Sequence, residues 1–236
     1  DIFCQRGKIK VPSNYNNLLA FMEGCIEEVQ PPIVDSSFHP KIWVLRFDSE
    51  NETTYRLVVL SRNLTFDRSW DISYFCDGKL TDTRNKESKK VSAYLQYFYK
   101  TSGRKIDNQF FSDLEKVEFE LPNGFSDFEI FPIEKFSSTT NGFDNPLDTA
   151  KYKRMLVISP FIDVATINKL KKNSGRLTLI SRKEELDQIE TGNLRGMDLY
   201  CMNPLIPDGE DFFDTEGIEP RSQNLHAKIF IGDDGE

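Results

Sequence analysis

The sequence predicts an α/β fold in two halves, on three observations. From about residue 155 onwards, strand-like and helix-like segments alternate at the spacing of a parallel or mixed sheet with helices on its faces. Residues 134–149 contain Ser-Ser-Thr-Thr-Asn-Gly and then Asp-Asn-Pro, which is linker composition. One His-x-Lys motif lies on each side of this stretch. We therefore expect an N-terminal half over residues 1–140 and a C-terminal half over residues 150–236.

The elements of the N-terminal half follow from periodicity and turn residues. Ser13 can cap a helix over residues 15–29, which the Pro31-Pro32 pair would stop. Strands are expected over residues 38–47 and 55–60, on either side of a polar turn. Further along the chain we expect a charged loop over 79–90, a helix over 91–100, and strands over 117–121 and 128–133.

The C-terminal half reads as strands and helices in turn. A buried strand is expected over residues 155–159, followed by a helix that Asp163 caps and that ends near residue 172. Residues 203–224 read as a long, acidic, polar loop that leads into the second His-x-Lys strand. Between them we expect a strand over 176–181, a helix over 183–189 and a strand over 197–202.

Composition places the chain among soluble globular proteins. It has 236 residues, 38% of them hydrophobic and 29% charged, and no apolar run approaches the roughly 18 residues of a membrane span. The net charge of −8 counts against a surface that coats nucleic acid without specificity, but allows a local basic groove. Four widely spaced cysteines without a CxxC pair favour free thiols, although a disulfide pair stays open. The chain begins without a signal-like segment, so a cytoplasmic location is expected.

Both histidines of the chain begin a His-x-Lys triplet that runs into an apolar strand. His39 and His226 share the same frame: apolar, His, variable, Lys, Ile, aromatic, branched aliphatic. Lys fills 18 of the 236 positions, so two histidines would both have Lys two residues on by chance roughly once in 170. A single His-x-Lys is usually a surface feature. Two matching copies favour a duplicated site that works on phosphate.

The spacing suits phosphodiester chemistry. Residues two apart in a strand point to one side, so His39 shares a face with Lys41, and His226 with Lys228. Ser61 and Asn63 end the strand after His39 and would join its motif if the two strands pair. A neutral imidazole can attack phosphorus and a protonated one can protonate the leaving oxygen, which an ordinary His pKa of ~6.5 permits. Lysine and asparagine would hold the non-bridging oxygens.

These motifs resemble the signature of the phospholipase D superfamily, His-x-Lys-x4-Asp followed by Gly-Ser-x-Asn. His226, Lys228 and Asp233 match the first part. The first copy has Arg46 at the Asp position, and Leu60 replaces the Gly before Ser61. Residues 157–162 also resemble the start of the family's second half. A first motif without its Asp is similar to the branch that contains tyrosyl-DNA phosphodiesterase and some bacterial nucleases.

The resemblance implies two similar α-β-α halves with mixed, mostly parallel sheets, related by a pseudo-twofold axis around one site. It implies a phosphohistidine intermediate, no metal and no cofactor. The roles it implies are His39 as nucleophile and His226 as general acid, with the reverse assignment open. Asp71 would orient a histidine, or is a capping or surface residue. The remaining residues carried over are phosphate-binding Lys41, Lys228 and Asn63, and supporting Ser61 and Asp233.

The function expected first is a nucleic-acid phosphodiesterase, a nuclease or end-processing hydrolase that acts on DNA. Both motifs lie in one chain, so a monomer could hold the site. Two alternatives stay open: a phospholipase or phosphatidyltransferase, and a non-catalytic phosphate-binding module of a defence or repair assembly. The family also has a Ser/Asn strand end after the second motif, whereas this sequence stops at Glu236. We therefore expect the second half to be truncated, and the fragment to be inactive if that strand end is required.

Overall fold

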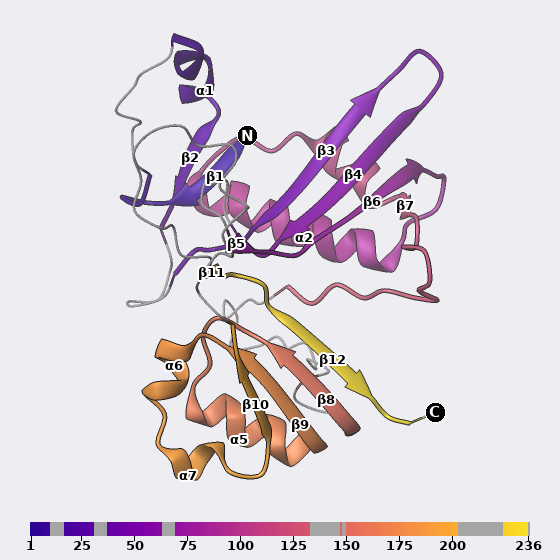
Figure 1. The fold of residues 1–236 in the computed structure, drawn as a ribbon. Coiled ribbons are helices and arrows are strands. Elements are labelled where there is room, and N and C mark those ends of the chain that lie inside the picture. Colours follow the sequence, from indigo (N-terminus) through magenta and orange to yellow (C-terminus); the bar gives the residue numbers. More distant parts are fainter. Residues whose placement is uncertain are drawn as a thin grey trace, which may run out of the picture. The chain divides into compact units, whose positions relative to one another are not determined.

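The computed structural model describes residues 1–9, 17–30, 37–62, 69–132, 147, 150–202 and 224–235. It is an α/β fold with mixed sheets (Figure 1). The chain divides into two compact units: unit 1 holds Asp1–Val58 and Phe75–Phe143, and unit 2 holds Val59–Tyr74 and Asp144–Glu236. The segment 59–74 therefore groups with the C-terminal residues and not with the N-terminal half in which the sequence places it.

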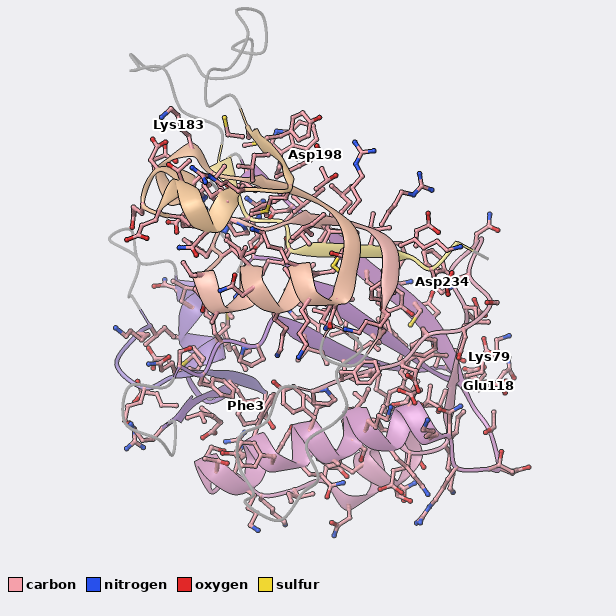
Figure 2. The ribbon with its side chains drawn as sticks, turned by 90° about the horizontal axis from the view of Figure 1, so that it is seen from below. Phe3, Lys79, Glu118, Lys183, Asp198 and Asp234 are labelled. Atoms are coloured by element: carbon pink, nitrogen blue, oxygen red, sulfur yellow. The ribbon has the colours of Figure 1, made fainter. Side chains whose placement is uncertain are left out.

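A four-stranded sheet carries most of unit 1. Its strand order is β3-β4-β6-β7, and a separate parallel pair is formed by β1 and β2. Figure 2 shows Lys79 and Glu118 next to each other, where β6 and β7 pair antiparallel. The strands are β1 Ile2–Gln5, β2 Ile26–Val29, β3 Ile42–Asp48, β4 Thr53–Leu60, β6 Ser73–Leu80 and β7 Val117–Phe119. The helices are η1 Asn17–Leu19, α1 Ala20–Glu23, α2 Lys86–Ser102 and α3 Asn108–Leu114.

Helix α2 has clear sequence signals at both ends. The Asn85 side chain accepts hydrogen bonds from the backbone N–H groups of Glu87 and Ser88, which satisfies donors that the first turn leaves unpaired. The helix ends at Gly103, whose φ of 77° a residue with a side chain rarely adopts. Its buried face contributes Val91 and Phe98 to the core, which β4 completes with Tyr55 and Leu57.

The sheet of unit 2 has the strand order β10-β9-β8-β12. β8, β9 and β10 are parallel, and β12 runs antiparallel to β8, as Figure 1 shows. A short parallel pair, β5 with β11, lies outside this sheet. The elements are β5 Ser69–Trp70, β8 Tyr152–Ile158, α5 Val164–Asn173, β9 Ser174–Ser181, α6 Lys183–Asp187, α7 Thr191–Leu194, β10 Asp198–Cys201, β11 Asn224–Leu225 and β12 Ile229–Asp233.

The core of unit 2 forms where α5 covers the sheet. It consists of Met155 and Val157 of β8, Leu170 of α5, and Leu177 and Leu179 of β9. The register pairs Ile229 with Ile158, so the residues before β12 lie at the edge where β8 ends. Because β9 and β10 are parallel to β8, their carboxyl ends reach the same edge. We call it the carboxyl edge of unit 2.

The alternation predicted for residues 155–202 is confirmed, with boundaries shifted by up to three residues. The helix expected over residues 15–29 is wrong. Among the described residues of that range, helical structure ends at Glu23, and residues 26–29 form β2. Parallel pairing with β1 overrides the helical pattern, since Ile26 and Val29 lie opposite Ile2 and Gln5.

Three other expectations for the N-terminal half need correction. The charged loop over residues 79–90 is much shorter, because β6 reaches Leu80 and α2 starts at Lys86. Residues 128–132 form no strand. The first His strand begins at Ile42 and not near residue 38, because Pro40 has no N–H to donate to a ladder. The expected linker, apart from Leu147, and residues 203–223 of the expected loop lie outside the described residues.

Candidate functional site

The first His-x-Lys motif lies just before β3 in unit 1. Its entry is fixed by Phe38, whose N–H donates to Gln5 Oε1 at 3.0 Å and whose ring packs edge-on against Phe98 at 4.9 Å. His39 is exposed, and Lys41 Nζ lies 2.8 Å from its Nδ1 and 3.1 Å from its Nε2. An ammonium group this close to both ring nitrogens lies against the face of the imidazole and not along one in-plane lone pair. The contact therefore places the cation of the first motif directly on its histidine.

Arg46 stands at the position of the family's Asp, five residues after Lys41. Its Nη1 donates to Asp113 Oδ2 at 2.9 Å, and its Nε donates to Asp48 Oδ1 at 2.9 Å. These carboxylates, with the Asp48 hydrogen bond first, raise the pKa of the guanidinium. Burial, the largest cause, raises the pKa of nearby Tyr55 to about 12. Arg46 thus neutralises Asp113, which is only 5% exposed, and both of its ion-pair partners belong to unit 1.

The second His-x-Lys motif lies just before β12 and is held by its backbone. The N–H groups of His226 and Ala227 both donate to the Trp70 carbonyl, at 3.0 and 2.8 Å. The preceding carbonyl, of Leu225, accepts from Arg182 Nε at 3.1 Å and Nη2 at 2.6 Å. Leu225 and Ala227 are buried on either side of the half-buried histidine. The imidazole is therefore presented by a backbone that β5 and Arg182 fix from two sides.

Ser61 and Asp71 belong to the same unit as His226. Ser61 Oγ donates to Asp71 Oδ1 at 2.9 Å and accepts from the Ile72 N–H at 3.0 Å. Arg62 Nε lies 2.8 Å from the other carboxylate oxygen, Asp71 Oδ2. Asp71 directly follows the residue whose carbonyl holds the His226 backbone. The strand end after the first motif is thus tied to the segment that supports the second.

Lys228 is electrostatically coupled to this group. Partial burial lowers its pKa, the positive charge of Arg182 lowers it further, and the carboxylate of Asp71 acts in the opposite direction. Its Nζ donates to the His226 carbonyl at 3.1 Å. Three cationic side chains, including Arg62, thus gather with one carboxylate, and this excess of positive charge suits an anion such as phosphate.

Asp233, which completes the second family signature, does not join this group in the described contacts. It lies opposite Arg154 in the β12–β8 register and accepts from Arg154 Nε at 2.8 Å. That hydrogen bond, the largest cause, lowers the pKa of the exposed Asp233 carboxyl. The fifth position after each motif lysine therefore carries an ion pair within its own unit, with the signs reversed: Arg46 with Asp113, and Asp233 with Arg154.

The expected site residues distribute unequally. Unit 1 holds the first motif, His39 and Lys41. Unit 2 holds Ser61, Asp71, His226, Lys228 and Asp233, so Ser61 belongs to the unit of the second motif and not to that of the first. Asn63 lies outside the described residues. Within the described ranges, no group of three or more His, Cys, Asp or Glu side chains is arranged to hold a metal ion.

Sequence reasoning missed the two arginines of the site. Arg62 and Arg182 each follow a serine at the end of a strand, β4 for Ser61 and β9 for Ser181. The buried Ser181 Oγ donates to the Ser159 carbonyl at 2.7 Å, which ties the ends of β8 and β9 together where Arg182 begins. The Ser-Arg pair that recurs at the two strand ends could have drawn attention to these arginines. No sequence pattern could have marked the role of the Trp70 carbonyl, because every residue type has a backbone acceptor.

Comparison with protein families, with curated proteins and with solved structures found no match to this chain. The resemblance to the phospholipase D superfamily therefore rests on the motifs of the sequence. The structure adds an α/β fold with mixed sheets, and a second motif whose backbone is hydrogen-bonded to the Trp70 carbonyl. Among the described residues, no helix combines the length and hydropathy of a membrane span.

Proposed function

We propose that the chain carries a metal-independent phosphodiesterase site that acts on nucleic acid through a phosphohistidine. One observation carries the proposal: residues remote in sequence, Ser61 and Asp71 on one side and His226 and Lys228 on the other, gather in unit 2 around a fixed backbone. That both His-x-Lys motifs take part in one reaction is carried over from the resemblance of the sequence motifs.

The proposed reaction has two steps. In the first, a ring nitrogen of His39 forms a bond to phosphorus, the P–O bond to the leaving group breaks, and the His226 imidazolium gives its proton to the leaving oxygen. In the second, water gives a proton to His226 and its oxygen attacks phosphorus, and the P–N bond breaks. Lys41, Lys228 and Arg182 hold the non-bridging oxygens as their charge changes. The reverse assignment of the two histidines uses the same groups.

The contact between Lys41 and His39 bears on the first step. Lys41 Nζ lies 2.8 Å from His39 Nδ1 and 3.1 Å from Nε2. A bound phosphodiester supplies a stronger acceptor for the ammonium than a neutral imidazole does. In the proposal, substrate binding therefore draws Lys41 from the imidazole to the phosphate.

The choice of nucleic acid over lipid rests on the first motif. Arg46 replaces the family's Asp, as in the branch of the superfamily that acts on DNA ends. The ion pair with Asp113 gives this arginine a structural role inside unit 1, and the choice of substrate rests on the motif alone.

The proposal is tested by trapping the covalent intermediate. The full-length protein is mixed with 5′- and internally labelled DNA oligonucleotides, with and without EDTA, and quenched in alkali, in which phosphohistidine survives. We expect EDTA-resistant labelling that His39→Gln abolishes, and slower turnover of the adduct in His226→Gln. Labelling lost in His226→Gln and kept in His39→Gln would reverse the two roles.

Two results would contradict the proposal. Loss of all labelling in EDTA would reject the metal-free mechanism, and absence of an adduct with every substrate would favour a phosphate-binding module. Phosphatidylcholine vesicles serve as the parallel substrate. Labelling by lipid and not by DNA would overturn the choice of nucleic acid.

A further inference from the structure

Three large aromatic side chains lie exposed along the carboxyl edge of unit 2. Tyr200, near the end of β10, is 59% exposed, and Phe161, three residues beyond β8, is 54% exposed. Trp70 is 61% exposed, and its carbonyl holds the segment that leads into β12. Exposed aromatic rings of this size are costly to hydrate, so their collection at one edge indicates a binding surface.

Cationic side chains alternate with these rings. Arg182 follows β9, the strand between β8 and β10, and its guanidinium carbon lies 4.7 Å from the centre of the Phe161 ring. The same guanidinium donates to the Leu225 carbonyl, and Lys228 follows three residues later. The order along the edge is therefore Tyr200, Arg182, Phe161, and then Lys228 beside Trp70. Neighbouring strands are about 4.8 Å apart, so the four strands extend this surface over about 14 Å.

This alternation fits one kind of polymer. A single-stranded nucleic acid offers free base faces for stacking and regularly spaced phosphates for cations. A duplex hides its base faces inside its own stack, and a lipid has no π-face to offer. Because the net charge of the chain is −8, electrostatic attraction of a nucleic acid has to come from this local group of cations and not from the surface as a whole.

We propose that the carboxyl edge of unit 2 binds single-stranded nucleic acid, with bases stacked on Tyr200, Phe161 and Trp70 and phosphates on Arg182 and Lys228. The inference rests on the proposed function for its chemistry, since it names the substrate class of that site. Binding itself needs no cleavage. It is therefore measured in the His39→Gln and His226→Gln double variant, so that failure of the reaction and failure of this inference give different results.

The two tryptophans of the chain, Trp43 and Trp70, allow a direct readout. In a Trp43→Phe background, Trp70 is the single indole. We expect a thymidine dodecamer to quench its fluorescence with saturation, and the duplex of that dodecamer with its complement to bind at least tenfold more weakly. Phosphatidylglycerol vesicles should leave the signal unchanged. Equal affinity for strand and duplex, a response to vesicles alone, or no response would overturn the proposal.

Phe161 and Phe75 form a matched pair of variants. Phe75 of unit 1 is also an exposed phenylalanine, at 63%, with the Arg56 guanidinium carbon 6.0 Å from its ring centre. Phe161→Leu should weaken dodecamer binding at least fivefold, whereas Phe75→Leu should leave it within twofold. Phe161→Tyr keeps a stacking face, adds no indole to the readout, and should restore the affinity, which separates stacking from misfolding. Equal effects of Phe161→Leu and Phe75→Leu, or no rescue by tyrosine, would contradict the assignment.

Discussion

At the scale of single residues, the two motif copies differ at the fifth position after the motif lysine, which is Arg46 in the first copy and Asp233 in the second. Arg46 departs from the phospholipase D signature that the motifs resemble, and its contacts give it a structural role. It bridges an exposed carboxylate, Asp48, and a buried one, Asp113. Asp233 follows the signature and makes a more exposed pair with Arg154. The sequence could predict the departure itself. It could not predict the compensation, because Asp113 lies 67 residues further along the chain.

Loss of the Arg46 guanidinium should destabilise unit 1. In Arg46→Ala, the buried carboxylate of Asp113 loses its cation, and we expect the free energy of unfolding to fall by about 2 kcal/mol, below the full cost of a broken buried pair because Arg46 is partly exposed. Urea denaturation at neutral pH measures the change. The matched control is Asp233→Asn, which breaks the exposed pair of the other copy and should cost much less. Equal costs would show that the Arg46 pair is not structural.

At the scale of elements, prediction succeeded where local pattern decides the structure. Residues 155–202 alternate because β8 and β9 bury every second residue of their central part and α5 has a capping aspartate, Asp163, whose carboxylate accepts from the Thr166 N–H. Prediction failed over residues 26–29, because pairing with the distant β1 makes this segment a strand. It also failed near Pro40, which has no N–H to donate, so that β3 begins only at Ile42. The anchoring of His226 by Arg182 depends on a backbone carbonyl, which no side-chain pattern marks.

The element-scale prediction concerns Arg182, which, besides the phosphate contact proposed for it, positions the backbone of the second motif. In Arg182→Gln the Leu225 carbonyl loses its two charged donors, so the His226 and Ala227 amides should exchange hydrogen at least tenfold faster. The pKa of Lys228 should also rise toward its ordinary value, because a positive charge that lowers it is gone.

The sign of the pH effect follows from that shift. Lys228 binds anions while protonated, so its lowered pKa makes the wild type lose orthovanadate affinity earlier as pH rises toward 10.5. In Arg182→Gln, the part of orthovanadate binding that depends on protonated Lys228 should be lost at a higher pH than in the wild type, even if the affinity of the variant at neutral pH is lower. NMR of isotopically methylated lysines gives the pKa, and Lys228→Met assigns the signal. An unchanged Lys228 pKa together with unchanged amide exchange would reject the positioning role.

At the scale of the whole molecule, the sequence predicted an α/β chain with one motif on each side of a linker. The two compact units of the structure meet along the chain between Phe143 and Asp144, within the predicted linker, and residues 59–74 also group with unit 2. The reason is a set of long-range contacts, the β5–β11 pairing and the bonds from His226 and Ala227 to Trp70. Such contacts join residues more than 150 positions apart, and local periodicity carries no information about them.

The central proposal, which rests on the two sequence motifs, is that both histidines take part in one phosphodiester reaction, and the chain allows a direct measurement because it has two histidines in all. Orthovanadate is titrated into the 236-residue chain while the imidazole Cε1–H signals are followed by NMR, with His39→Gln assigning the two. The account predicts that both signals shift with one dissociation constant, and that His226→Gln weakens the response of His39. A shift of one signal alone, or two constants that differ by more than tenfold, would contradict it.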